Sequence, residues 1–254
     1  MLSTATNSRK LHRADKLSDY SLRGIDGNIG TVKEFYFDDS HWTIRYIIAN
    51  TGNWLSGRQV LISPHSLGAV NNEEEFIAVN LTQKQMEDSP TFKTGQTVSR
   101  QFEYEYNTHY GLPTYWNGTN VAAAQPNIER DTNMPVESVP NEQIRDHQLH
   151  NTSDVSGYDI EASDGEIGDV KDFIIDDETW AIRYLIVDTG GWLPGKKVLI
   201  APQWIERVSW EESKVFVNLS RDAIEKSPEF TEELTRDYEA GLYKHYNRQG
   251  YWID

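Results

Sequence analysis

The sequence predicts a mainly β protein made of two copies of one small domain. Three observations support this prediction. The chain of 254 residues repeats itself at a constant offset, its apolar runs are short and separated by turn residues, and 29 of its residues are aromatic although only 37% are hydrophobic. Disordered chains are poor in aromatic residues, so we expect folded domains with real cores.

The repeat sets the domain boundaries. Residues 11–92 align with residues 149–230 without a gap, at an offset of 138, and 37 of the 82 aligned positions are identical. The match resumes with residues 100–116 and 236–252 at an offset of 136. Both copies then end in His-Tyr, four variable residues and Tyr-Trp. We therefore expect one domain at 1–116 and a second at 149–254.

A flexible linker is predicted between the two domains, over residues 117–148. This segment has no aromatic residue, contains three of the nine prolines, and carries five acidic and two basic side chains. Such a composition cannot supply a hydrophobic core.

Short strands are predicted in the same order in both copies, because runs rich in β-branched and aromatic residues alternate with turn residues. Asp26-Gly27 and Asp164-Gly165 are typical turn dipeptides. Pro64 and Pro202 are expected to end a strand, since proline cannot donate to a β-ladder. The predicted strands are 32–37, 44–49, 60–62 and 76–81 in the first copy, and 170–175, 182–187, 198–200 and 215–219 in the second.

Helices are predicted at the end of each copy. Ser220 is a plausible N-cap for a short helix that begins at Arg221 and ends before Pro228. Thr231 is expected to cap a longer helix that runs through Tyr246, because apolar residues recur there at a spacing of four. That stripe consists of Leu234, Tyr238, Leu242 and Tyr246.

The acidic net charge of the chain limits the kinds of partner that it is expected to bind. The net charge is −16 and the pI is about 4.8. Nucleic-acid binding depends on Lys and Arg, so we expect no nucleic-acid partner. Residues 1–116 carry 11 basic and 13 acidic side chains, whereas residues 149–254 carry 11 and 22. The two copies therefore present different surfaces.

The lack of cysteine excludes thiolate chemistry, and no apolar run is long enough to insert into a membrane. We expect a soluble, cytoplasmic protein.

The repeated motif resembles that of a known family. Each copy contains Asp-Gly-x-Ile-Gly-x-Val-Lys-x-Phe, then Asp-Asp, Trp-x-Ile-Arg-Tyr, Thr-Gly-x-Trp-Leu-x-Gly and Val-Leu-Ile-x-Pro. This pattern resembles the PRC-barrel domain of the photosynthetic reaction-centre H subunit and of a ribosome-maturation factor family. The resemblance implies two small PRC-type β-barrels in tandem, each with a C-terminal helical extension, that dock on other proteins.

Matched polar residues are the candidates for chemistry. The pairs His12/His150 and His109/His245 recur in both copies, but without the spacing of a metal site. For His109 and His245, a hydrogen bond that orients a helix end is the favoured role. Asp38-Asp39 and Asp176-Asp177 lack the calcium-loop pattern and are expected to form polar hairpin turns. The sequence predicts no catalytic residue, no cofactor and no metal site.

One loop in each copy is a candidate for partner binding. It contains Trp54, Leu55 and Arg58 in the first copy, and Trp192, Leu193 and Lys196 in the second. An aromatic, an aliphatic and a basic residue together are typical of a binding hot spot. The alternative is that the tryptophan folds back onto the barrel.

The favoured function is a non-enzymatic, bivalent protein–protein interaction or adaptor module with an unidentified protein partner. One alternative is an accessory subunit of a membrane electron-transfer or photosynthetic reaction-centre complex. A further alternative is an uncharacterised stress-related structural protein in which the two barrels pair within the chain. An enzyme is not expected.

Overall fold

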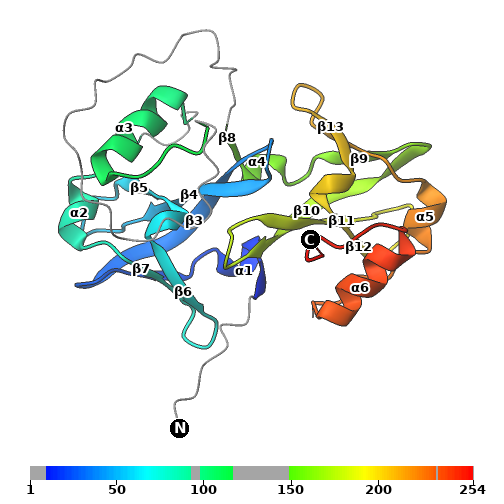
Figure 1. Ribbon diagram of the computed structural model, residues 1–254, viewed down its shortest axis with the longest axis horizontal. Coiled ribbons are helices and arrows are strands. Elements are labelled where there is room, and N and C mark those ends of the chain that lie inside the picture. The colour runs from blue at the N-terminus through cyan, green and yellow to red at the C-terminus, as the bar shows by residue number, and fades with distance from the viewer. Residues whose placement is uncertain (1–9, 93–97, 117–148, 233, 254) are drawn as a thin grey trace.

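The computed structural model describes residues 10–92, 98–116, 149–232 and 234–253. Both copies have the same order of elements (Figure 1). The first copy contains β1 (Leu11–Arg13), α1 (Ala14–Leu17), β2 (Ser21–Arg23), β3 (Asn28–Asp38), β4 (Thr43–Asn50), β5 (Gln59–Ile62), the 3₁₀ helix η1 (Pro64–Ser66), β6 (Leu67–Asn71), β7 (Phe76–Val79), α2 (Gln83–Glu87) and α3 (Arg100–Tyr110).

The second copy repeats this series. Its elements are β8 (Leu149–Asn151), α4 (Thr152–Val155), β9 (Asp159–Ala162), β10 (Gly165–Asp176), β11 (Ile182–Asp188), β12 (Lys197–Ile200), η2 (Pro202–Trp204), β13 (Ile205–Ser209), β14 (Lys214–Val217), α5 (Arg221–Glu225) and α6 (Arg236–His245). The prediction of a mainly β protein with two similar units is confirmed. The predicted linker, 117–148, lies outside the described residues.

Each copy forms an open sheet rather than a closed barrel, so this part of the prediction is wrong. The hydrogen-bonded order is β5-β4-β3-β2-β7-β6 in one sheet and β12-β11-β10-β9-β14-β13 in the other. Among the described strands, no ladder joins the two ends of either path. After the end strands β5 and β12, Pro64 and Pro202 begin a 3₁₀ turn, and the strands that follow, β6 and β13, pair with β7 and β14 at the opposite end of each path.

The seventh strand of each sheet comes from the other copy. β1 pairs antiparallel with β10, so that Leu11 lies opposite Asp176. β8 pairs antiparallel with β3, so that Leu149 lies opposite Asp38. These two registers are equivalent, because Leu149 lies 138 positions after Leu11 and Asp38 lies 138 positions before Asp176. The two copies therefore exchange their first strands reciprocally.

A second contact between the copies is formed at the β3–β4 and β10–β11 turns. Trp42 and Trp180 both have a left-handed backbone, with φ of 50° and 57°. The amide of Ile182 donates to the Trp42 carbonyl at 2.7 Å, and the amide of Ile44 donates to the Trp180 carbonyl at 2.8 Å. A left-handed backbone is costly for a non-glycine residue, and these reciprocal bonds offset part of that cost.

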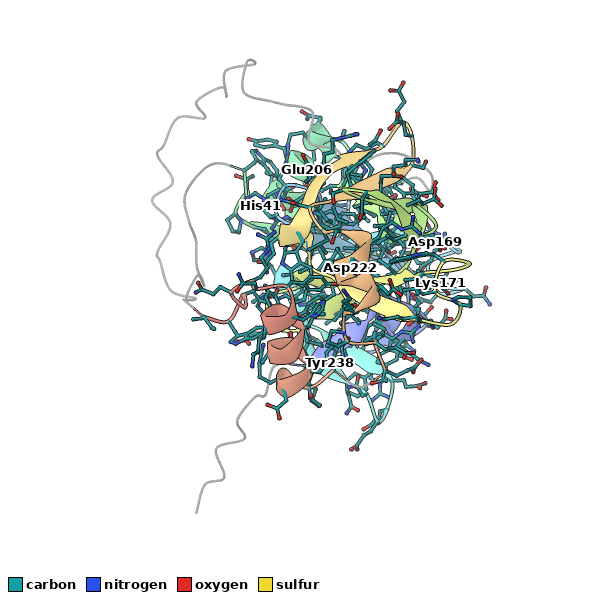
Figure 2. The ribbon with its side chains drawn as sticks, turned by 90° about the vertical axis from the view of Figure 1, so that its right-hand side faces the viewer. His41, Asp169, Lys171, Glu206, Asp222 and Tyr238 are labelled. Atoms are coloured by element: carbon teal, nitrogen blue, oxygen red, sulfur yellow. The ribbon has the colours of Figure 1, made fainter. Side chains whose placement is uncertain are left out.

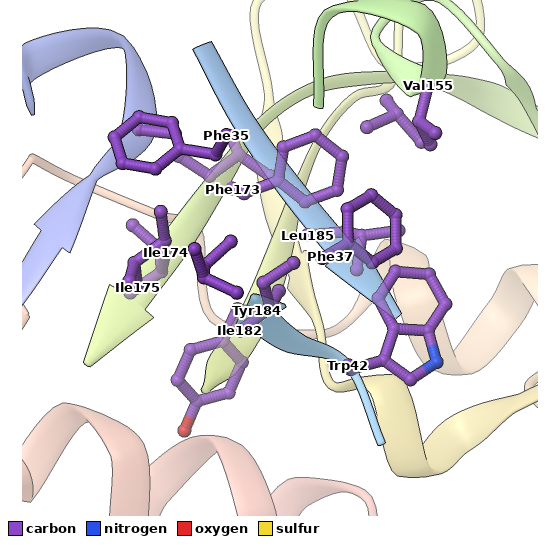
Figure 3. Packing of buried hydrophobic residues seen from close by; sticks show 14 of the residues in the cluster. Phe35, Phe37, Trp42, Val155, Phe173, Ile174, Ile175, Ile182, Tyr184 and Leu185 are labelled. Carbon is purple, nitrogen blue, oxygen red and sulfur yellow. The ribbon is translucent and has the colours of Figure 1, made fainter. Parts of the chain in front are cut away.

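The main core is continuous across the two copies (Figure 3). The Phe37 ring stacks on Trp42 at a centroid distance of 5.3 Å and lies 5.9 Å from Phe173 of the second copy. Ile174 and Ile182 belong to the same buried cluster. Because aromatic and aliphatic residues of both copies bury one another, the pair behaves as a single packing unit.

The two matched glycines Gly30 and Gly168 allow β3 and β10 to approach the ends of β4 and β11 closely. Their φ angles are +146° and +143°, which residues with a side chain rarely adopt, and a Cβ would lie only 2.1 Å and 2.0 Å from the carbonyl oxygens of Asn50 and Asp188. The sequence motif therefore requires glycine for close backbone approach. Gly30 lies within β3.

The helical extensions are present, but one boundary prediction is wrong. Ser220 caps α5 as predicted, by accepting from the Ala223 amide. The long helix, however, begins at Arg236 with Thr235 as its cap, not at Thr231. Both threonines satisfy the N-cap preference, and Thr235 is the one that lies one turn ahead of the buried Glu239.

Candidate functional site

A buried aspartate–arginine pair lies beneath the turn that ends β3 and its counterpart that ends β10. Asp176 is fully buried and accepts from Arg183 Nε at 2.9 Å and Nη2 at 2.7 Å, and from the Thr179 hydroxyl at 2.9 Å. Asp38 accepts from Arg45 Nε at 2.6 Å in the first copy. The predicted role of these aspartates in polar turns is confirmed, since charge-assisted bonds hold each turn closed.

The same arginines reach the C-terminal extensions. The Arg183 guanidinium lies 4.3 Å from the centre of the Tyr251 ring, and Arg45 lies 3.8 Å from the ring of Tyr115. Cation–π contacts of this kind stabilise by about 1 kcal/mol when partly desolvated. The repeated Tyr-Trp ending is therefore part of the site and packs on the start of β4 and β11.

Each extension also buries one glutamate. Glu239 is 2.8 Å from the Tyr184 hydroxyl, 2.7 Å from the Tyr251 hydroxyl and 2.9 Å from Arg236. In the first copy, Glu103 accepts from Tyr115 at 2.9 Å and from Arg100 at 2.9 Å. Two matched networks thus fasten the helices α3 and α6 to the sheets, and sequence reasoning missed both.

Burial changes the ionisation of one of these glutamates. Glu103 is 0% exposed. Desolvation raises its pKa from 4.5 to about 7, although the nearby Arg100 guanidinium and the Tyr115 hydroxyl act in the opposite direction.

A groove with a volume of about 490 Å³ lies between the two copies. The first copy contributes the turn 39–42, and the second contributes the edge strand β13, the start of β11 and Tyr251 of the extension. Figure 2 labels His41 and Glu206, which belong to different copies and line the same groove. Its charged side chains include Arg183, Arg207 and Glu206, beside the aromatic Trp210.

The matching position in the first copy is nearly filled. A pocket of only about 100 Å³ lies there, bounded by Arg45, Tyr115 and Pro113. The groove has additional walls formed by Glu206, Arg207 and Trp210, which stand where the first copy has the smaller residues Gly68, Ala69 and Asn72. The sequence analysis did not predict these residues as part of a site. The difference between the two otherwise similar copies at these positions could have indicated them.

The matched histidines His12 and His150 lie at the strand exchange. His12 Nε2 is 3.0 Å from Asp177 Oδ2, and His150 Nε2 is 3.7 Å from Asp39 Oδ2. His150 also stacks on Trp210, with ring centres 3.3 Å apart. Their role is thus to join the copies.

The second histidine pair has a local role. His245 Nε2 lies 2.7 Å from the carbonyl oxygen of Ala223, so it links α6 to α5. His109 packs edge-on against Tyr110. Within residues 10–92, 98–116, 149–232 and 234–253, no group of three His, Asp or Glu side chains could hold a metal ion.

The predicted binding loops lie at opposite ends of the molecule, beside α2 and α5 (Figure 1). Arg58 donates to the carbonyls of Glu87 and Ser89, and Lys196 donates to those of Glu225 and Ser227. Both cations therefore cap the C-terminus of a short helix, where carbonyls lack intrahelical partners.

The hydrophobic residues of these loops are only partly covered. Trp54 is 38% exposed, and its indole nitrogen donates to the Ile29 carbonyl at 2.6 Å. Trp192 is less exposed, and the Arg221 guanidinium lies 4.7 Å from its ring centre. Leu55 and Trp192 pack against the main core, whereas Leu193 donates its amide to Thr189 within the loop.

The family description of the PRC-barrel domain matches the chain twice, at residues 10–86 and 148–224. The chain belongs to the PRC-barrel domain family. Each PRC-barrel match begins one residue before an exchanged strand and ends in α2 or α5. The extensions α3 and α6 lie outside the matched segments.

An uncharacterized protein of Deinococcus radiodurans is similar to this PRC-barrel chain. The two are 31% identical over 87 residues, which cover 34% of this chain and 30% of the relative. The chain therefore spans less than a third of that relative's length. Among the described residues, no helix has the length and apolar character needed to cross a bilayer.

Proposed function

We propose that this tandem PRC-barrel protein is a cytoplasmic, non-enzymatic docking scaffold whose protein partner binds in the groove between the two copies. The reciprocal strand exchange carries this proposal. It holds the turn 39–42 of the first copy against β13 of the second, so the groove is already formed in the unbound chain. Preorganised surfaces bind with a smaller loss of conformational entropy.

The composition of the groove supports a protein partner. Trp210, Val208 and Ile205 supply apolar area, while Arg207 and Glu206 are exposed at its edge. Interfaces combine aromatic and arginine anchors with a polar rim. In addition, β13 ends the hydrogen-bonded path of its sheet, so it offers a strand edge to an extended segment of the partner.

The absence of a catalytic role is part of the same proposal. Asp176 and Arg183 are each other's partners, and Glu239 is held by two tyrosine hydroxyls and Arg236. These groups hold the fold together, and in this proposal they form part of the groove's support and take no part in a reaction.

The test is site-specific photo-crosslinking of the intact protein in its native cells. A photoreactive residue at His41 or Glu206, on the two walls of the groove, is expected to capture one defined protein. The same residue at Asp222, on the outer surface of α5, is the matched control (Figure 2). The captured partner, once purified, should bind the unmodified chain and lose affinity at least tenfold for Arg207→Glu.

Two results would overturn the proposal. One is equal capture at His41, Glu206 and Asp222. The other is unchanged affinity of the purified partner for Arg207→Glu, provided that circular dichroism shows this variant to be folded.

A further inference from the structure

A second surface, distant from the groove, has the composition of a ligand site. A hollow of about 430 Å³ lies beside the exposed indole of Trp54. Its other walls are asparagine, threonine, glycine and glutamine residues, and none of the lining residues is charged although a quarter of the chain is. The lining residues are Asn28, Gly30, Thr31, Asn50, Thr51, Gly52, Trp54 and Gln83.

The aromatic wall is rigid. The bond from the indole nitrogen to the Ile29 carbonyl, 2.6 Å long, fixes the ring plane of Trp54. Gly52 and Gly57 flank the loop, and a Cβ at either position would meet no atom within 4 Å, so the loop is open beside both glycines, while the Trp54 side chain itself is 38% exposed. A fixed and accessible aromatic face is preorganised for stacking.

The polar walls have unused hydrogen-bonding capacity on amide groups whose positions are set by the backbone. Asn50 Oδ1 accepts from the Gly52 amide at 3.2 Å, and Asn28 Oδ1 accepts from the Gly30 amide at 2.8 Å. Gln83 Nε2 donates to the Asn28 carbonyl at 2.9 Å, so its Oε1 is directed away from that bond. An amide has both donor and acceptor atoms, which suits a ligand hydroxyl that does both.

The second copy differs at four of the eight matched positions, and each of the four carries a charged residue there. Asn28, Thr31 and Asn50 are replaced by Glu166, Asp169 and Asp188, and Gln83 is replaced by Arg221. Arg221 lies over the Trp192 ring. The tryptophan is kept in both copies, but only in the first copy does it face neutral amides and hydroxyls.

From these observations we infer that the hollow beside Trp54 binds a neutral oligosaccharide. A sugar ring presents an apolar C–H face, which stacks on the indole, and a rim of hydroxyl groups, which bond to Asn28, Asn50 and Gln83. A peptide anchor would instead require further apolar or charged walls, as found in the groove. An anionic ligand is not favoured, because none of the lining residues is basic.

The test is calorimetric titration of the full-length protein with cellohexaose, maltohexaose and chitohexaose as probes. At least one of these neutral oligosaccharides is expected to bind saturably, at one site per chain, in the millimolar range or tighter. Trp54→Ala should weaken this binding at least tenfold, whereas the matched change Trp192→Ala should leave it unchanged.

Two further variants retain Trp54 and guard against misfolding. Asn50→Asp copies the second copy's residue, which makes the same turn contact through Asp188 Oδ1 and the Gly190 amide at 2.9 Å. Gln83→Arg copies Arg221. Both are expected to lower oligosaccharide affinity at least fivefold while the melting temperature stays within a few degrees of the unmodified protein.

Saturation by a proline-rich peptide in place of the three oligosaccharides would overturn the inference. The same conclusion would follow if none of the three bound saturably, or if Trp54→Ala bound as tightly as the unmodified chain. Arg207→Glu, in the groove, should not affect oligosaccharide binding. The experiment therefore tests the oligosaccharide site independently of the proposed docking groove.

Discussion

The imidazole of His12 lies 3.0 Å from the carboxylate of Asp177, although 165 residues separate them in the chain. His12 belongs to the exchanged strand β1, and Asp177 follows β10 of the other copy. Their counterparts, His150 and Asp39, face each other in the same way at 3.7 Å. The two copies are thus joined at two equivalent places within the described residues.

Cleavage of the chain between the copies should therefore leave one particle. A protease site inserted between residues 117 and 148, cut after purification, is expected to give two fragments that elute together at the size of the intact 29.2 kDa chain. Two strand ladders and a shared core remain after the cut. Size-exclusion chromatography with light scattering measures the outcome.

The matched control is the same cut protein with Leu149→Asp, which places a charge at a buried position of β8. This variant should separate into its two fragments. Separation of the unmodified cut protein would contradict the prediction.

Stability is predicted to fall as the pH rises from about 4.5 to about 7. The pKa of Glu103 rises from 4.5 to about 7 on folding because the carboxyl is buried. The folded state then binds a proton more tightly than the unfolded state, so its extra stability is present below pH 4.5 and is lost as the pH passes 7. The full effect is about 3 kcal/mol.

Glu103→Gln should remove this share of the pH dependence of the unfolding free energy, measured in urea at several pH values. Asp172 contributes with the same sign, because burial and the neighbouring Asp15 raise its pKa from 3.8 to about 7. The variant Asp172→Asn should remove that second share. A pH dependence in Glu103→Gln as steep as in the unmodified protein would show that Glu103 is not responsible.

Gly168→Ala is expected to destabilise the protein by more than about 3 kcal/mol. The new Cβ would lie 2.0 Å from the Asp188 carbonyl oxygen, and φ is +143° at this position. Gly191→Ala is the control, since a Cβ there meets nothing within 4 Å. Thermal unfolding of the two variants measures the difference, and equal melting temperatures would be inconsistent with a required close approach.

Lys196→Met should cost about 1–2 kcal/mol, because its ammonium group donates to the Glu225 and Ser227 carbonyls at 2.5 Å and 2.8 Å. The loss should appear as earlier hydrogen exchange in α5. Lys171→Met, at an exposed position (Figure 2), is the control and should change stability by less than about 0.5 kcal/mol. An equal effect of both changes would mean that Lys196 does not cap the helix.

The parts of the fold that depend on local sequence could be predicted. Apolar runs located the strands that became the central parts of β3, β4, β10 and β11, and Ser220 located the start of α5. β6 and β13 were not predicted, because Leu67–Asn71 and Ile205–Ser209 mix glycine or charged residues with few apolar ones. Their conformation depends on pairing with β7 and β14.

The strand exchange could not be derived from the residues, although its components were visible. His12 and His150 were recognised as a matched pair, as were Asp39 and Asp177. Pairing within a copy and pairing between copies satisfy the same local pattern, because strand partners distant in sequence carry no local signal. The groove was missed for a related reason, since its walls come from both copies.

The exchange of first strands between the copies limits which mutations the duplicated gene can tolerate. Loss of the second half by a premature stop would remove β8 from the edge of β3 and uncover Phe37 and Trp42 of the first half. Loss of the first half would uncover β10 in the same way. A duplicated gene usually leaves a spare copy that can decay, but here neither half is spare, so selection must retain both while their outer faces diverge.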